Sequence, residues 1–201
     1  VYKILGNVIK EISPVMFEGD NYSQEWYNEA KKRKLPNEPS SARALSAFIK
    51  QENIRLFETQ KVLSSIELHA RYNIWVDIYN KVIDIEGRTL LEMVGTQILP
   101  AAYEFQYRIG QGLDILKSVL ADKKTKVPAG AVDDRRQMFA NMSQDIYQIR
   151  VHLRKLKTML DKCDAMDETK RAKYYFDDVR PQMEEIRKRV DDLETLMPDD
   201  M

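Results

Sequence analysis

Residues 142–163 read MSQDIYQIRVHLRKLKTMLDKC, and the spacing of their apolar residues decides the fold class. The steps are 4, 3, 4, 3, 4 and 3, through Met142, Ile146, Ile149, Leu153, Leu156, Leu160 and Cys163. Alternating steps of four and three place these side chains on one face of a helix, as in the seam of a coiled coil. The stretch therefore predicts a long helix that packs along one side.

A second seam follows after a short link. It steps by 4, 3, 4, 3 and 4, through Val179, Met183, Ile186, Val190, Leu193 and Met197. The link at residues 164–166 is so short that the two helices must lie antiparallel. Asp167 is placed to cap the last helix. Pro181 lies inside that helix and predicts a bend, because proline lacks the backbone N–H that the helix needs.

The sequence before the first seam predicts another long helical stretch, from residue 64 to about residue 122. Ser64 and Glu67 form a capping-box motif at its start. The residues expected on its packed face are Leu68, Tyr72, Trp75, Tyr79 and Val82, then Ala102, Phe105, Ile109, Leu113, Leu116 and Leu120. Pro100 predicts a kink or a break near Leu99.

The junction between this stretch and the first seam reads as a loop. Residues 123–132 contain Pro128 and Gly130, both typical of turns. Asp133 is then expected to cap the next helix, because its carboxylate can accept from free N–H groups.

The beginning of the chain predicts shorter pieces. Residues 1–12 are apolar-periodic and predict a helix that ends before Pro14. Ser23 can cap a second helix that reaches about Arg33. The chain starts inside an apolar-periodic stretch and without Met, so we expect it to be cut from a longer polypeptide. A native start after processing is the alternative.

The remaining boundaries follow from prolines and apolar spacing. Residues 34–41 predict a loop, and short helices are expected over residues 41–49 and 52–60. We therefore expect a short-helix connecting region at residues 1–63 and a long-helix bundle domain at residues 64–201.

The composition agrees with a helical protein. Of 201 residues, 32 are Lys or Arg and 32 are Asp or Glu, whereas only 7 are Gly and 7 are Pro. Glu, Lys and Arg lose little rotamer freedom in a helix, and all-β folds need more turn residues. The predicted fold class is all-α, with short irregular helices followed by long helices in an elongated antiparallel up-down bundle.

Charge and cysteine content exclude several functions. A net charge of zero argues against a nucleic-acid or anionic membrane surface. A single cysteine excludes an internal disulfide framework and a cysteine-cluster zinc site. No apolar run approaches the ~18–20 residues of a membrane span, and no signal peptide is visible. We expect a cytoplasmic protein with neither a nucleic-acid nor a membrane partner.

Few residues are candidates for chemistry. Neither His69 nor His152 follows a Glu by three residues, as ligands of a di-metal helical bundle would. His152 followed by Lys155 faintly resembles a phosphotransfer helix, and an ordinary helix-surface histidine is the alternative. Residues 110–112 read GQG, but they lack the preceding strand and the third glycine of a phosphate-binding loop.

Three further features are interpreted as structural. Cys163 lies on the first seam, which predicts a buried thiol rather than a reactive one. The basic group Arg150, Arg154, Lys155 and Lys157 is expected to pair with the acidic residues Glu184, Glu185, Asp191 and Asp192. The aromatic residues expected in a core or interface are Tyr72, Trp75 and Tyr79. We predict no catalytic, cofactor-binding or metal-binding residue in this chain, which leaves a binding or scaffolding role.

Residues 17–26 read FEGDNYSQEW and resemble the segment of type III glutamine synthetases that reads F-N-G-D-G-Y-S-x-E-W. The similarity continues in the family's order through Glu29-Ala30, Lys32-Arg33, Leu35-Pro36-Asn37, Leu56-Phe57, Val62-Leu63-Ser64, Glu67-Leu68, Arg71-Tyr72, Ile85-Glu86 and Ile98-Leu99-Pro100-Ala101-Ala102. Glu18 departs from the family's Asn, and Asn21 and Lys34 depart from its Gly. Asn21 can keep a left-handed turn, whereas Lys34 does so less readily, so we expect that loop to differ.

The resemblance implies the C-terminal part of a ligase that uses ATP and Mg to join ammonia to glutamate. In that family the metal-binding, phosphate-facing and ammonia-site residues lie upstream of this segment, so no catalytic position is carried over. The implied partners are the protein's own catalytic domain and identical subunits of a dodecamer. The alternative is a free-standing helical adaptor that binds a partner helix through residues 142–163 and 179–197.

Overall fold

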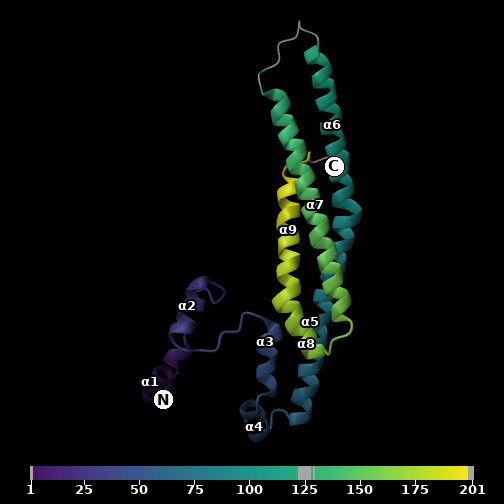
Figure 1. Cartoon of the computed structure of the whole chain (residues 1–201). Coiled ribbons are helices and arrows are strands. Elements are labelled where there is room, and N and C mark those ends of the chain that lie inside the picture. The colour runs from purple at the N-terminus through teal and green to yellow at the C-terminus, as the bar shows by residue number, and fades with distance from the viewer. Residues whose placement is uncertain (1, 122–127, 129, 199–201) are drawn as a thin grey trace.

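The computed structural model describes residues 2–121, 128 and 130–198, and every regular element in that part of the chain is helical. A long rod consists of α5 (Ser65–Met93), a π-helical turn η3 (Val94–Ile98) and α6 (Leu99–Ala121). The helix α7 (Ala131–Cys163) runs back along it, and α8 (Glu168–Tyr174), the π-helical turn η4 (Tyr175–Val179) and α9 (Arg180–Glu194) return beside α7. Figure 1 shows that the outer part of the α6–α7 hairpin extends beyond α9. The predicted all-α, elongated antiparallel architecture is confirmed.

Both predicted seams lie in the main core, where α5, α6, α7 and α9 meet. Leu156, Leu160 and Cys163 of α7 and Ile186 and Leu193 of α9 have no exposed side-chain surface. Leu153, Met183 and Met197 are only partly buried at the edge of this core. The link between the two seams is as tight as expected, and Asp167 accepts a hydrogen bond from the Lys170 N–H at 3.1 Å as the N-cap of α8.

The packed face of α5 differs from the expected one. Leu68 and Tyr72 are buried as predicted, but Val82 is exposed and Ile83 is buried in its place. The full buried set is Leu68, Tyr72, Val76, Asn80, Ile83 and Gly87. These residues advance mostly by four, because α5 packs against α8 in its first half and against α7 further along.

The two prolines inside helices leave the chain helical. Each follows a π-helical turn by two residues, Pro100 after Ile98 and Pro181 after Val179. The N–H of Leu99 donates to Val94 and that of Arg180 to Tyr175, each five residues back. A widened turn relieves the clash of the proline ring with the carbonyl four residues earlier. The expected break near Leu99 is therefore a π-turn within a continuous rod.

One predicted cap is wrong. The helix α7 begins at Ala131 and not after Asp133, and its N-cap is Gly130, whose φ is +94°. Asp133 lies inside the first turn, where a carboxylate still interacts favourably with the helix dipole. The capping box of α5 is confirmed, because Ser64 accepts from Glu67 N–H and the Glu67 carboxylate accepts from Ser64 N–H at 2.8 Å. Most of the predicted loop at residues 123–132 lies outside the described residues.

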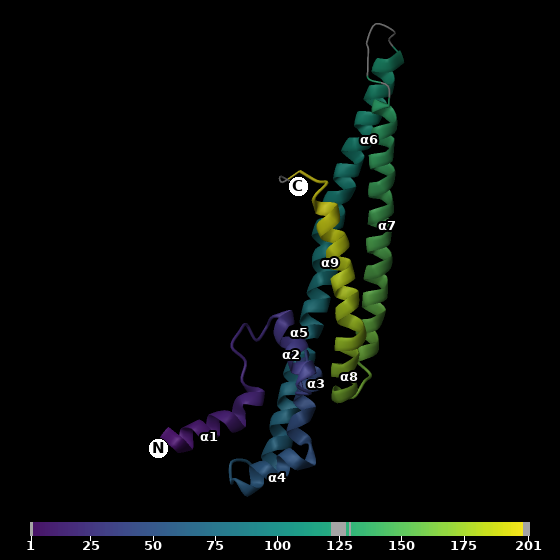
Figure 2. The ribbon, with the colours of Figure 1, turned by 90° about the vertical axis from the view of Figure 1, so that its left-hand side faces the viewer.

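The first part of the chain forms two groups of short helices. In the first group, α1 (Tyr2–Ile12) and a 3₁₀ turn η1 (Ser13–Val15) lead to α2 (Gln24–Lys32). In the second group, α3 (Ser41–Ala44), a 3₁₀ turn η2 (Leu45–Ile49) and α4 (Gln51–Thr59) pack on α5. Figures 1 and 2 show α1 extending away from the bundle in both views.

The second group is joined to the bundle by specific contacts. Arg43 of α3 lies 2.7 Å from Asp177 in η4, and its guanidinium lies 5.2 Å from the centre of the Phe176 ring. Phe48 in η2 meets Trp75 of α5 edge to face at 4.8 Å. The division between residues 1–63 and 64–201 remains a prediction, and residues 41–59 pack on the bundle across it.

Two turn expectations need correction. Lys34 has a φ of +58° and ends α2 with the Leu35 N–H on Ala30 at 2.9 Å, so the position that is Gly in the resembled family keeps its left-handed turn. Asn21 is not left-handed. There the turn is held by Asp20, whose carboxylate accepts from the Tyr22 N–H at 2.9 Å and whose carbonyl accepts from Ser23.

Candidate functional site

The candidate site is an apolar docking surface on α1. Its side chains, which we call the α1 face, are Ile4, Leu5, Val8, Ile9 and Ile12. They recur at steps of one, three and four and so share one side of the helix. None of α1 is buried, and each of these five side chains is between 44% and 68% exposed. Figure 2 shows α1 projecting away from the long helices of the described chain.

The connection behind α1 is well ordered by polar contacts. Arg33 at the end of α2 donates to the carbonyl of Pro14 at 3.2 Å and to that of Met16, and its Nε donates to Glu29 at 2.7 Å. Among the interactions that lower the pKa of Glu29, the hydrogen bond from Arg33 has the largest effect. Phe17 packs against Trp26 with ring centres 5.0 Å apart. The α1 face is therefore presented on a structured arm.

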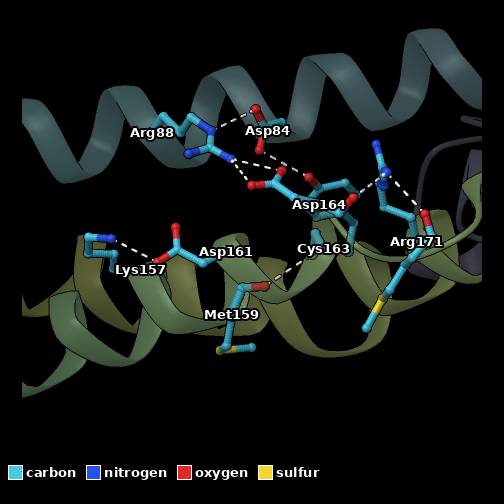
Figure 3. Close-up of polar contacts among 10 residues, drawn as sticks. Asp84, Arg88, Lys157, Met159, Asp161, Cys163, Asp164 and Arg171 are labelled. Carbon is cyan, nitrogen blue, oxygen red and sulfur yellow. Dashed lines mark hydrogen bonds and ion pairs between the residues drawn. The ribbon is translucent and has the colours of Figure 1, made fainter.

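A polar cluster joins the α7–α8 turn to α5 (Figure 3). Arg88 donates to Asp84 at 2.8 Å and to Asp164 at 3.2 Å. The Tyr175 hydroxyl donates to the other oxygen of Asp84 at 3.1 Å, and burial raises the pKa of Tyr175. Arg171 donates to the carbonyl of Met166 at 3.0 Å. The cluster connects three helices and gives the carboxylates cationic and hydroxyl partners, so its role is structural.

Cys163 is buried beside this cluster, as predicted. Its thiol donates to the carbonyl of Met159 at 3.2 Å, and burial raises the pKa of the thiol. Since the thiolate is the reactive form, a raised pKa and a buried sulfur make this residue a poor nucleophile.

The histidines face structural partners. His152 is half-buried, and its Nδ1 lies 2.8 Å from the amide nitrogen of the buried Gln182 in α9. The same amide donates to the His152 carbonyl at 3.3 Å. His152 therefore contacts α9 rather than standing on a free surface, which argues against the phosphotransfer interpretation. His69 is exposed, and its Nδ1 lies 2.8 Å from the Ser65 carbonyl.

The predicted pairing of the basic residues of α7 with the acidic residues of α9 is wrong. Lys157 pairs with Asp161 of its own helix at 2.7 Å, and Arg150 donates to the Tyr103 hydroxyl at 3.2 Å. Because the seams of both helices point into the core, their charged faces point outward and away from each other. Three of the four acidic residues have partners four residues away, in the pairs Arg180–Glu184, Arg189–Glu185 and Arg187–Asp191.

The predicted aromatic group is structural as expected. Tyr72 and Tyr79 pack with the small cluster around Val76 and Ala172, and Trp75 meets Phe48. Residues 110–112 lie within α6, so they form no phosphate-binding loop. The sequence interpretation missed an outward apolar stripe on α5, although the spacing of Ile74, Ile78, Val82 and Ile85 contains its signal.

Neither a membrane-spanning helix nor a group of metal-binding side chains occurs in the part of the chain that the structure describes. No helix within residues 2–121 or 130–198 combines the length and apolarity of a membrane span. Across the same residues, no three side chains of His, Cys, Asp or Glu gather in a way that could hold a metal ion.

Comparison with known proteins gives the family. Residues 1–117 match the family described as glutamine synthetase C-terminal domain. The chain is 30% identical to the type-3 glutamine synthetase of Dictyostelium discoideum over 201 aligned residues, which cover 98% of the chain and 26% of that protein. It is 26% identical to the glutamine synthetase of Bacteroides fragilis (strain YCH46), over 100% of the chain and 27% of the relative.

A third relative, the glutamine synthetase of Butyrivibrio fibrisolvens, is also 26% identical over 99% of the chain and 28% of its own length. The chain thus spans about a quarter of the length of the curated relatives that it matches. The similarity covers 98–100% of the chain, including the arm that carries the α1 face and the long helices α5, α6, α7 and α9. The chain belongs to the glutamine synthetase C-terminal domain family and is homologous to type III glutamine synthetases.

Proposed function

We propose that this chain is a non-catalytic helical domain of a type III glutamine synthetase, which packs on the catalytic domain and supports assembly of identical subunits. The observation that carries this proposal is the uncovered α1 face. A helix of 11 residues is too short to be stable in water by itself, so α1 needs a packing partner. The described residues supply none, and the relatives are about four times as long as this chain.

The described residues offer no group of three His, Cys, Asp or Glu side chains for the metal of the implied reaction. Within residues 2–121 and 130–198 the acidic side chains are dispersed along helices and form no three-ligand group. Many are in ion pairs with Lys or Arg three or four residues away. Magnesium bound together with phosphates is held by one or two carboxylates, the phosphates and waters. On the relationship to type III glutamine synthetases, we assign ATP and Mg to the part of the enzyme outside this chain and route no chemical step through these residues.

The surfaces through which a free-standing adaptor was expected to bind a partner helix are buried within this chain. It required the seams at residues 142–163 and 179–197 to be open to a partner helix. Both seams pack in the main core, where Ile149 and Ile186 have no exposed surface. A free-standing adaptor would therefore have to use another surface. An open reading frame that starts close to Val1, with no synthetase-like sequence before it, would favour that interpretation.

An activity assay tests the non-catalytic part of the proposal. The isolated 201-residue chain, incubated with glutamate, ammonia, ATP and Mg, is expected to form no glutamine. Turnover that follows the chain through purification would contradict the assignment of the chemistry to another part of the enzyme.

Variants of the α1 face test the docking part. In the full-length synthetase that the proposal requires, Val8→Glu combined with Ile9→Glu is expected to reduce both assembly, measured by sedimentation, and glutamine formation. The matched control is Ile115→Glu, which changes an exposed apolar residue of α6. Figure 1 shows the helix α6 away from α1. Unchanged assembly in the double variant would overturn the role of the α1 face. Cytoplasmic localisation and a dodecameric state belong to the same proposal.

A further inference from the structure

The outward side of α5 carries an apolar stripe that nothing in the described chain covers. We call Ile74, Ile78, Val82 and Ile85 the α5 stripe, and their exposed fractions are 57%, 51%, 45% and 63%. Residues 74 and 85 lie 11 positions apart, close to three full turns of a helix with 3.6 residues per turn. The stripe is therefore nearly straight. It faces away from the buried side, which carries Val76 and Ile83.

Shallow hollows lie beside the stripe and widen its apolar surface. One is lined by Ile78 and Val82 together with Phe48 and Trp75. The next one along α5 has an apolar part formed by Ile85, Leu90, Met93 and Met183. Its polar part is formed by Glu86, Thr89, Arg180, Glu184 and Arg187. Side chains from a packing helix could enter these hollows, as ridges enter grooves in helix pairs.

The charges at the ends of the stripe are complementary to each other. Arg71 precedes the stripe on the same side of α5, and Glu92 follows it. Both are exposed, and neither side chain has an ion-pair partner within 4.0 Å in the described residues. The two positions are 21 residues apart, or about 30 Å along a helix. They cannot pair within one straight helix.

A second copy of α5, packed antiparallel to the first, would give the charged residue at each end of the stripe an oppositely charged partner. If residue i faces residue 163 − i of the other copy, Arg71 meets Glu92, Ile78 meets Ile85 and Val82 lies beside the two-fold axis. Ile74 then meets Thr89. The stripe is thus complementary to itself in one register, in which Ile78–Ile85 contacts flank the axis, Val82 faces Lys81 and an Arg–Glu pair lies at each end. Such self-complementarity is what a two-fold interface requires.

Two further charged groups on this part of α5 have partners within their own chain, whereas Glu86 is exposed and has no ion pair within 4.0 Å among the described residues. Lys81 is paired with Asp77 at 2.7 Å, and Arg88 is held by Asp84 at 2.8 Å. We propose that the α5 stripe is a two-fold interface at which two copies of this chain pack with their α5 helices antiparallel. This interface is separate from the α1 face, so it extends the proposed assembly without depending on docking of α1.

Disulfide trapping tests the register. Cysteine pairs link only when their Cα atoms lie within about 7 Å. Val82→Cys is expected to cross-link to itself, because that residue lies beside the axis. Ile78→Cys alone and Ile85→Cys alone should cross-link poorly, whereas a mixture of the two variants, carrying tags of different mass, should give the mixed dimer. The native Cys163 is fully buried and adds no background.

The matched control is Ile66→Cys, which places a thiol on the same helix at an apolar residue that is 82% exposed and lies off the stripe. It should give no dimer. Cross-linking of Ile66→Cys to the same extent as Val82→Cys, or of Ile78→Cys with itself in preference to Ile85→Cys, would overturn the antiparallel register. A chain that stays monomeric in sedimentation at all concentrations would overturn the interface itself.

Charge reversal gives an independent test. Arg71→Glu is expected to weaken dimerisation on the order of tenfold, because it turns two attractive pairs into repulsive ones. Adding Glu92→Arg to the same chain should restore the original dissociation constant within about twofold, whereas absence of this rescue would contradict the predicted pairing. Circular dichroism melts verify that each variant is folded. These variants leave the α1 face intact, so failure here would not bear on the docking of α1.

Discussion

The Leu160 side chain of α7 lies directly against Gly87 of α5, and a β-carbon at Gly87 would come within 3.1 Å of Leu160 Cδ2. Both residues belong to the buried face between the two long helices. The absence of a side chain at Gly87 therefore lets α7 approach α5 closely at this level. A glycine in a helix interior is otherwise unfavourable by about 1 kcal/mol relative to alanine, so close packing offsets its weak helix propensity here.

We expect Gly87→Val to lower the free energy of unfolding by about 1–3 kcal/mol, because the added methyl groups overpack the contact with Leu160. Urea unfolding followed by circular dichroism measures this change. Gly95→Ala is the control, since a β-carbon at Gly95 meets nothing within 4 Å. A Gly87→Val protein as stable as the parent would mean that the helices are further apart than described.

The different burial of residues on the seams of α7 and α9 predicts different losses of stability when their side chains are truncated. Ile186→Ala should lower the free energy of unfolding by about 2–5 kcal/mol, because it leaves a cavity in a core position with no exposed surface. Leu153→Ala should lower it by less, since Leu153 lies at the edge of the core and is only partly buried. Thermal or urea melts of both variants check the order, and equal losses would contradict the difference in burial.

The residues that are buried in α5, α7 and α9 show how much of the core could be predicted from the sequence. The helical period of the apolar residues correctly predicted which sides of α7 and α9 face the core, because each helix packs on one continuous side. It gave the wrong residue on α5, with Val82 in place of Ile83, because that helix meets different neighbours along its length. The predicted pairing between the charges of α7 and α9 was also wrong, because Arg150 and Lys157 have closer partners than the acidic residues of α9.

Turn geometry was the least predictable part. A lysine at position 34 gives no local signal for a left-handed backbone, and the same holds for Lys61 at the end of α4, with a φ of +54°. The π-turns before Pro100 and Pro181 respond to a steric clash that a sequence pattern registers only as a kink. The docking surfaces were partly visible as apolar spacing, but only the packing shows which apolar faces remain uncovered.

Lys34→Gly is expected to raise the free energy of unfolding by about 1 kcal/mol, because a side chain in the left-handed region carries a steric penalty that glycine lacks. The measurement is urea unfolding, and the midpoint of the transition is expected to move to a higher urea concentration. Lys34→Ala serves as the control, since it removes the same charge and keeps the β-carbon. If both variants behaved alike, the charge rather than the backbone conformation would account for the change.

The Cys163 thiol should resist alkylation in the folded protein. Burial raises its pKa, so the fraction of thiolate at neutral pH falls below that of an ordinary cysteine, and the sulfur is also shielded from reagents. Labelling with iodoacetamide at about pH 8, followed by mass spectrometry, should show modification only where urea unfolds the chain. Labelling of the native protein at the rate of a free thiol would contradict the burial.

The capping box of α5 predicts a pH dependence. Hydrogen bonds from the Ser64 N–H and then from its hydroxyl lower the pKa of Glu67 from its ordinary 4.5. A carboxylate whose pKa is lower when folded stabilises the protein above the ordinary value, and this contribution is lost as the pH falls through the folded value. Replacing Glu67 with Gln should therefore reduce stability at neutral pH and make little difference at the acidic end of that window. Urea midpoints of both proteins across the acid range should converge, and curves that stay parallel would show that the carboxylate is not held by Ser64.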